Sequence, residues 1–97
     1  MDDGEVLVIV EIKEVLDAAE FQAYQTEVRE MFKNQSGVVV ARGGVAFEGD
    51  PLNSSLVVQR WPSQKAFCDW QESEAYRPLR ERRLRGAKLR ILIVPAV

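Results

Sequence analysis

The stretch that decides the fold is Val38 to Gly49, which reads V-V-V-A-R-G-G-V-A-F-E-G. Its first residues are too rich in β-branched side chains for a helix, so they predict a strand. Arg42 stands at the end of this apolar run. The pair Gly43-Gly44 follows, and glycine suits a backbone with positive φ or a bulge. The stretch therefore predicts a strand that ends in an arginine and then bends.

A strand and a helix are expected before this stretch. Residues 5–12, E-V-L-V-I-V-E-I, are almost continuously apolar, which predicts a strand covered on both faces. Asp17 and Glu20 form a capping-box-like pair that predicts the beginning of a helix. Gly37 suits the left-handed position that closes this helix. Its apolar stripe consists of Phe21, Tyr24, Val28, Met31 and Phe32.

After the stretch, the sequence predicts a hairpin and another helix. Segment 48–55 is rich in turn-forming residues. Residues 56–61, L-V-V-Q-R-W, predict a third strand that pairs antiparallel with the second. Pro62 ends that strand, and Ser63 supplies the N-cap of a short helix over 64–72.

The last part of the chain predicts a second helical piece and a fourth strand. The helical piece begins at Ser73, is interrupted by Pro78 and ends at Gly86. Residues 89–94, L-R-I-L-I-V, predict the strand. The resulting order is β-α-β-β-α-β, an α+β ferredoxin-like arrangement. We expect a single domain over 1–97, with a four-stranded antiparallel sheet and helices on one face.

Such a sheet leaves one of its faces without helices. The first and fourth strands carry apolar residues at both alternating positions, so both faces of the sheet are apolar. Soluble monomers rarely expose an apolar patch above roughly 300 to 600 Å². We therefore expect a second copy of the chain to cover the free face, which makes the protein a homodimer.

The missing residue types exclude several classes of chemistry. The chain has 97 residues, no histidine and one cysteine. It cannot by itself supply a Ser-His-Asp triad, a histidine-ligated haem, or a zinc or iron–sulfur site held by several thiolates. We expect no metal and no cofactor. The acidic start, M-D-D-G-E at residues 1–5, is unlike a signal peptide, and no apolar run approaches the roughly 20 residues of a membrane span. These features favour a cytoplasmic protein that does not enter a membrane.

Basic residues are concentrated near the C-terminus. Residues 77–90 hold seven of the 13 basic residues against one acidic residue, Glu81, although the whole chain has a net charge of −2. Such a cluster suits phosphate or nucleic acid. It is also typical of a solvated helix face that pairs with acidic segments. No aromatic residues are interleaved to stack on bases, which disfavours a nucleic-acid partner.

Polar residues inside apolar strands are candidates for function, because burying one without a partner costs several kcal/mol. Arg42 ends its strand beside two glycines, where an arginine can bind a carboxylate, phosphate or enolate oxygen. Gln59 and Arg60 point to opposite faces of the third strand, so at least one of them faces a covered region. In the alternative interpretation, Glu11 and Arg42 form a structural ion pair or lie at exposed strand ends.

Three residues outside the strands complete the candidate site. Arg82 is expected to reach the same cleft as Arg42, and Tyr76 or Glu48 is expected to be the hydrogen-bonding or acid–base partner. In the alternative interpretation, Tyr76 packs in the core with its hydroxyl at the surface. The catalytic candidates are Arg42, Glu48 and Tyr76, and the ligand-binding candidates are Arg42, Gln59, Tyr76 and Arg82.

Several short motifs together resemble a family of small bacterial proteins, domain of unknown function 1330, of the dimeric α/β-barrel superfamily. They are A-R-G-G at 41–44, E-G at 48–49, W-P-S at 61–63, and S-E-A-Y-R-P-L at 73–79 followed by Arg82 or Arg83. The resemblance implies that two sheets pack face to face into a barrel across a dimer axis. The family commonly has an acidic residue where Gln59 stands, so a role that needs a carboxylate there does not carry over.

The leading hypothesis is a homodimer with one small-molecule pocket per subunit, between sheet and helices. A cofactor-free isomerisation, cyclisation or oxygenation of an anionic or carbonyl-containing metabolite suits the available residues better than hydrolysis, which usually uses histidine or a metal. The superfamily includes monooxygenases, polyketide cyclases and lactone isomerases, and fold alone does not select among them. The alternative is a non-catalytic ligand-binding or assembly module, in which the arginines serve the dimer or a protein partner.

Overall fold

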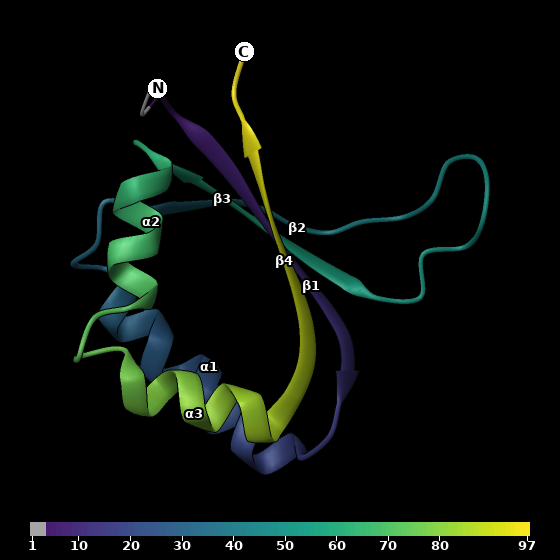
Figure 1. Ribbon diagram of the computed structural model, residues 1–97. Helices are drawn as coiled ribbons and strands as arrows, with labels where there is room; N and C mark the ends of the chain where they lie inside the picture. Colours follow the sequence, from purple (N-terminus) through teal and green to yellow (C-terminus); the bar gives the residue numbers. More distant parts are fainter. Residues whose placement is uncertain (1–3) are drawn as a thin grey trace.

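The computed structural model describes residues 4–97 and has the expected order of elements, with the second helical region in two pieces as predicted (Figure 1). The second of these helices begins at Arg77 and not at Ser73. The first three residues of the acidic start lie outside the described part. The elements are β1 (Val6–Val15), α1 (Ala18–Phe32), β2 (Val38–Gly43), β3 (Ser55–Trp61), α2 (Gln64–Gln71), α3 (Arg77–Gly86) and β4 (Ala87–Pro95).

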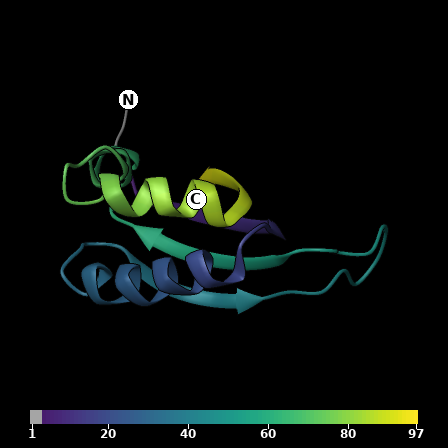
Figure 2. The ribbon, with the colours of Figure 1, turned by 90° about the horizontal axis from the view of Figure 1, so that it is seen from below.

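The four strands form one antiparallel sheet in the order β2-β3-β1-β4. The helices lie on one face of this sheet, and α1 and α3 pack against each other there (Figures 1 and 2). This arrangement confirms the predicted α+β ferredoxin-like fold. No helix within residues 4–97 is both long enough and apolar enough to cross a membrane.

The helix starts have the predicted N-caps, but the reciprocal half of the capping box at α1 does not form, because the N–H of Asp17 donates to the carbonyl oxygen of Gly86 over 3.1 Å. The backbone N–H of Glu20 donates to Oδ1 of Asp17 over 3.1 Å, and the N–H of Ala66 donates to Oγ of Ser63 over 3.0 Å. Each bond satisfies one of the N–H groups that the first turn of a helix leaves without a partner. Local sequence therefore sets where α1 and α2 begin.

Two expectations about the helices are wrong: the interruption at Pro78 and the left-handed conformation of Gly37. Pro78 does not interrupt a helix, because α3 begins only at Arg77 and Pro78 lies in its first turn, where a missing N–H removes no helical bond. Gly37 does not adopt the left-handed conformation. It is buried directly against the indole of Trp61, where a Cβ atom would not fit. Gly43 and Gly44 do have positive φ, as expected.

A bulge in β2 decides where Arg42 points. Val39 lies opposite Gln59 and Arg42 lies opposite Val57, so Val40 is an extra residue on this strand. In a regular strand, residues three apart face opposite sides of the sheet. The bulge places Val39 and Arg42 on the same side as Gln59 and Val57, which is the side of the helices.

The core lies between the sheet and the helices and is largely aromatic. The Trp61 side chain is 1% exposed and makes edge-to-face contacts with Phe32 and Phe67, at centroid distances of 5.6 and 5.5 Å. Trp70 contacts Tyr76 at 4.6 Å. Contacts of this kind add to the stabilisation from burial and fix the orientation of each ring.

The other face of the sheet is apolar and carries no helix. Ile9 at its centre lies between Val58 of β3 and Leu92 of β4. Near one end of this face, Glu11 accepts from Ser54 over 2.6 Å and from Arg90 over 2.8 Å. The hydrogen bond from Ser54, and to a smaller extent the one from Arg90, holds the pKa of the Glu11 carboxyl below its ordinary value of 4.5. The expectation that strands are covered on both faces is thus not met within one chain.

Candidate ligand-binding site

A cavity of about 160 Å³ lies between the helix-facing side of the sheet and the helices. Most of its wall is aliphatic and aromatic. The polar exceptions are three arginines (Arg29, Arg42 and Arg83), two tyrosines (Tyr24 and Tyr76) and three glutamines (Gln25, Gln59 and Gln71). Apolar walls with a few convergent polar groups are typical of small-molecule sites.

The charge of this cavity is one-sided. No acidic residue of the described chain lines it, and none of its three arginines forms an ion pair within residues 4–97. Arg83 is only 7% exposed. Burying a guanidinium without a counter-charge is costly, because the group loses its hydration and gains no ion pair. The cavity lining therefore carries an excess of positive charge, of which only the charge of Arg83 is buried, since Arg29 and Arg42 are exposed residues.

Arg83 instead contacts neutral groups. Its Nη1 donates to the hydroxyl of Tyr76 over 3.2 Å and more weakly to Oε1 of Gln71 over 3.5 Å. The Tyr76 hydroxyl is also 2.8 Å from the hydroxyl of Tyr24. The guanidinium carbon lies 6.0 Å from the centre of the Tyr76 ring. A chain of hydrogen bonds thus runs from α3 to α1 along the helix wall of the cavity.

Burial controls the ionisation of Tyr24 within this chain. It raises the pKa of the Tyr24 phenol strongly above its ordinary value of 10.0, and the adjacent Tyr76 raises it further, while Arg83 acts in the opposite sense. At neutral pH this hydroxyl is therefore fully protonated and can donate a hydrogen bond.

We expect Tyr24 to resist alkaline titration. A raised pKa means that the folded protein holds this proton more tightly than the unfolded chain does, so the associated stability is present below pH 10 and is lost as the pH rises above it. Ultraviolet absorbance of tyrosinate measures this directly, because the chain has two tyrosines. The native protein should ionise fewer of them near pH 10 than the denatured chain does, because Tyr24 keeps its proton. Equal titration of native and denatured protein would contradict the burial argument.

Gln59 has its orientation fixed by Trp61. The indole Nε1–H donates to Oε1 of Gln59 over 2.8 Å. An indole nitrogen is only a donor, so the amide oxygen must face it and the NH₂ group lies at the other end. Since Gln59 also lines the cavity, its NH₂ is the group that can meet a ligand.

The structure brings three of the predicted site residues together and leaves two out. Arg42, Gln59 and Tyr76 line the same cavity. The hydroxyl of Tyr76 is not at the surface, since the residue is 1% exposed. The alternative ion pair between Glu11 and Arg42 does not form, because Glu11 pairs with Arg90. The other part of that alternative is confirmed for Arg42, which is an exposed residue near the end of β2 as well as a lining residue of the cavity.

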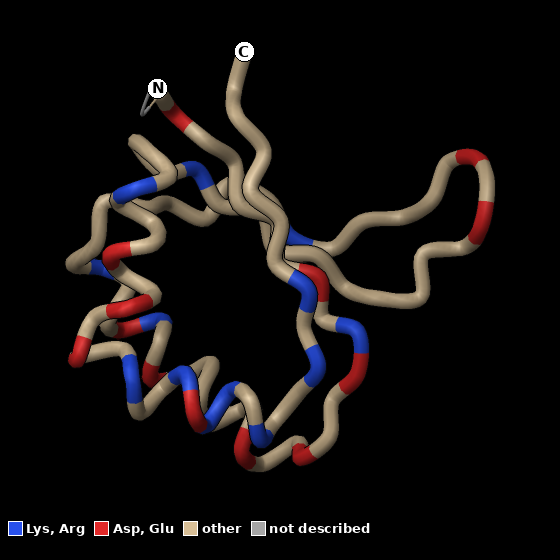
Figure 3. The backbone as a smooth tube through the Cα atoms, viewed as in Figure 1, with Lys and Arg blue, Asp and Glu red and all other residues tan. Residues whose placement is uncertain are grey.

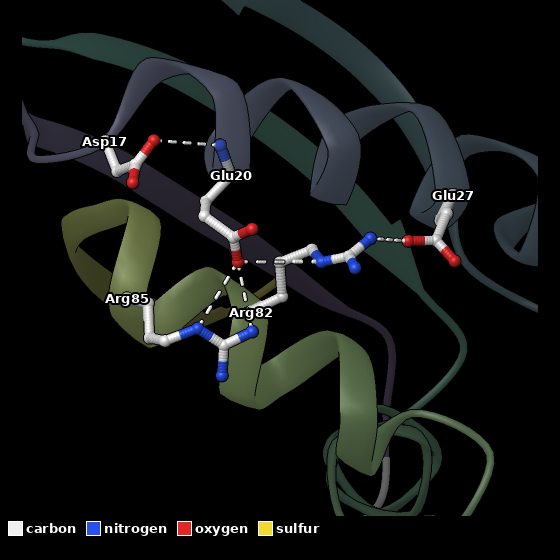
Figure 4. A network of polar contacts seen from close by, with 5 residues as sticks. All are labelled: Asp17, Glu20, Glu27, Arg82 and Arg85. Carbon is white, nitrogen blue, oxygen red and sulfur yellow. Dashed lines mark hydrogen bonds and ion pairs between the residues drawn. The ribbon is translucent and has the colours of Figure 1, made fainter.

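Arg82 does not reach the cavity, contrary to the prediction. It points to the α1 side of α3, where it pairs with Glu27 and approaches Glu20 at 3.7 Å (Figure 4). Arg85 also pairs with Glu20, at 3.0 Å. Its neighbour Arg83 takes the expected place of Arg82. The spacing of Arg83 from the buried residues Tyr76 and Leu79, seven and four positions earlier, is the helical signal that identifies it.

Glu48 also lies away from the cavity. It is an exposed residue of the long loop between β2 and β3, which projects beyond the sheet and has acidic positions at its tip (Figures 1 and 3). Phe47 beside it is 99% exposed. No contact in the described chain places Glu48 near Arg42 or Tyr76, so the prediction that it completes this site does not hold within one subunit.

The basic stretch 77–90 mostly pairs with acidic residues of the same chain. Lys88 pairs with Glu14 at 3.7 Å and Arg90 with Glu11 at 2.8 Å, in addition to the pairs of Arg82 and Arg85. Figure 3 shows the two charge types side by side on the helices. This pattern matches the expectation of a solvated helix face. Within residues 4–97, no group of three acidic or cysteine side chains is placed to hold a metal ion.

The sequence matches a family model, domain of unknown function 1330, over residues 5–97. The chain belongs to this family. No protein with a curated description matches the sequence. The predicted family membership is therefore confirmed, while the family description itself assigns no reaction.

Solved structures with the same fold include proteins described as oxygenases. SnoaB, a cofactor-independent oxygenase from Streptomyces nogalater, is 20% identical, with a TM-score of 0.69 over 99% of this chain and 95% of that one. RPA0582, a protein of unknown function from Rhodopseudomonas palustris, is 16% identical, with a TM-score of 0.80 over 99% and 85% of the two chains. A putative antibiotic biosynthesis monooxygenase from Caulobacter crescentus is 17% identical, with a TM-score of 0.72 over 98% and 92%. Such low identities establish the shared fold.

Proposed function

We propose that this member of the family binds a small anionic or carbonyl-containing metabolite in the cavity between sheet and helices. The observation that carries the proposal is the buried Arg83, which shares the cavity with two further arginines and has no carboxylate partner in the described chain. An oxyanion supplied by a ligand would provide the missing counter-charge. A cavity of about 150 Å³ is large enough to bind benzene, so the ligand is of that size or projects from the opening.

The same groups suit a cofactor-free isomerisation, cyclisation or oxygenation. Such reactions develop negative charge on an enolate oxygen, and positioned N–H and O–H donors stabilise that charge. Arg83 and the Tyr24–Tyr76 pair provide these donors on the helix wall, and Arg42 and Gln59 provide them on the sheet wall. The structural similarity to a cofactor-independent oxygenase supports oxygenation as one member of this set.

A non-catalytic ligand-binding module is the second candidate. It is favoured by the absence of any carboxylate or histidine from the cavity lining of residues 4–97. The phenol of Tyr24 is a poor base, since its pKa is raised and a very small fraction is ionised at neutral pH. Catalysis would then require a substrate that ionises without help, whereas binding requires only the donors.

We further propose that the protein is a cytoplasmic homodimer that forms through the helix-free face of the sheet. This face presents Ile9, Val58 and Leu92 as neighbours on three strands, a composition suited to packing against a second copy. The polar cluster of Glu11, Ser54 and Arg90 is internally paired, so it can be covered without leaving a charge unmatched.

Arg42→Ala tests the binding site, with benzoate as the probe. We expect benzoate to bind the native protein more tightly than benzyl alcohol, and Arg42→Ala to weaken benzoate binding roughly tenfold or more, because a charge-assisted hydrogen bond is lost. Titration calorimetry measures both affinities.

Arg82→Ala is the matched control. It removes the same charge from the surface of α3, outside the cavity. We expect it to change benzoate affinity by less than about twofold, because Arg82 forms only partly exposed ion pairs, with Glu20 and Glu27. Unchanged benzoate binding by a folded Arg42→Ala variant would remove Arg42 from the site.

A further inference from the structure

We propose that the cavity selects a ligand group that carries only hydrogen-bond acceptors, such as a carboxylate or an enolate oxygen, and that Gln59 enforces this choice. The inference rests on the proposed function, because it specifies which of the anionic or carbonyl-containing groups the same cavity accepts. It follows from which atoms of the polar side chains remain for a ligand after their contacts with each other are formed.

On the sheet wall, the available group of Gln59 is a donor. Its oxygen already accepts the indole N–H of Trp61, as described above. Trp61 cannot release this bond by turning, because its ring is enclosed by Phe32 and Phe67 and lies against Gly37. No buried side-chain nitrogen or oxygen in the described chain lacks a partner. The Gln59 NH₂, for which the structure shows no hydrogen bond, is therefore accessible.

On the helix wall, a count of hydrogens gives the same result. Tyr24 and Tyr76 carry one hydroxyl hydrogen each, and one of the two lies in the bond between them. Tyr76 also accepts from Arg83. Whichever hydroxyl donates in the shared bond, the other hydrogen remains free for the cavity. This wall therefore offers one O–H donor next to a guanidinium, besides the lone pair that the Tyr24 oxygen keeps in either arrangement.

Gln71 also presents a donor, whereas Gln25, the third glutamine of the lining, is exposed and has no hydrogen bond in the described chain that orients its amide. Oε1 of Gln71 accepts from Arg83, which leaves the NH₂ of Gln71 as its free group. A guanidinium has donors only, so Arg42 adds more of them. A ligand amide would direct its own N–H groups at these donors and leave both sides unsatisfied. A carboxylate has no hydrogen at neutral pH, so each of its lone pairs can meet a donor.

The test compares benzoate with benzamide, which have the same shape and differ in charge and in hydrogens. Titration calorimetry of the native protein at neutral pH should give at least about tenfold tighter binding of benzoate. Gln59→Glu keeps an oxygen facing Trp61 and replaces the NH₂ by a second oxygen. This variant should lose benzoate affinity by roughly a hundredfold and reduce or invert the preference over benzamide.

Gln22→Glu is the control for net charge, since it makes the same substitution on the exposed side of α1. It should leave both affinities unchanged. Far-ultraviolet circular dichroism and tryptophan fluorescence establish that the Gln59→Glu variant is folded with its indole still buried. If a folded Gln59→Glu variant keeps the native preference, or if benzamide binds the native protein as tightly as benzoate, the inference is overturned while the binding site stands. If neither compound binds the native protein, the proposed function fails and the inference with it.

Discussion

Gly37→Ala is expected to destabilise the protein by about 3 kcal/mol or more, which is a large part of the 5 to 15 kcal/mol typical of a domain. An ideal Cβ at this position would lie 2.7 Å from Cδ2 of Trp61 and closer still to the facing edge of the indole. The ring cannot move away, because Phe32 and Phe67 pack against it. Overpacking at a rigid contact must therefore displace backbone or aromatic rings. Thermal denaturation should show a midpoint lower by roughly 10 °C or more.

Gly4→Ala provides the matched control for this substitution. No atom lies within 4 Å of an ideal Cβ at Gly4, and its φ is not positive. The control variant should therefore keep the native midpoint. If Gly37→Ala also keeps it, the close approach of the backbone to Trp61 does not limit stability. A variant that is destabilised but still folded should additionally lose benzoate affinity, because displacement of Trp61 releases the Gln59 amide.

Ile9→Glu is expected to dissociate the proposed homodimer while leaving the subunit folded. Ile9 lies at the centre of the helix-free face, so a two-fold interface would bury both introduced carboxylates near each other. Burying unpaired charges costs several kcal/mol, and we expect the dimer to weaken by about 3 kcal/mol or more, a factor above roughly a hundred. In the monomer, the same side chain would face solvent and cost little. Sedimentation velocity over a range of concentrations measures the change.

Leu84→Glu is the control for the interface. Leu84 is a half-exposed apolar residue on α3, on the side of the sheet that carries the helices. The same charge introduced there should leave the dimer intact. A native protein that sediments as a monomer at micromolar concentration would contradict the dimer proposal. A dimer that survives Ile9→Glu would locate the interface on another surface.

The local features of the fold could be predicted because neighbouring residues determine them. The caps at Asp17 and Ser63 depend on hydrogen bonds over three residues, and the strands depend on β-branched runs. The limits of these elements were less well predicted. The first strand extends to Val15 and the last begins at Ala87, because pairing between β1 and β4 continues past a bulge after Ile12. Such pairing depends on a distant partner strand, which local composition does not reveal.

The candidate site was predicted in part. Arg42, Gln59 and Tyr76 stand out in the sequence as polar groups in apolar surroundings, and all three line the cavity. The exchange of Arg82 for Arg83 has a simple cause. Adjacent residues on a helix point about 100° apart. Which of them faces the cavity therefore depends on how α3 is rotated against α1 and the sheet.

The sequence by itself determined the family, the order of strands and helices, and a set of polar residues that lack an obvious structural role. Only the tertiary structure decided which of those residues meet. The β2 bulge aims Arg42 at the helices, the rotation of α3 buries Arg83, and the indole of Trp61 orients Gln59. Each of these choices depends on contacts between segments far apart in the chain. Propensity and periodicity act over a few residues, so they specify the elements but not how one element orients the side chains of another.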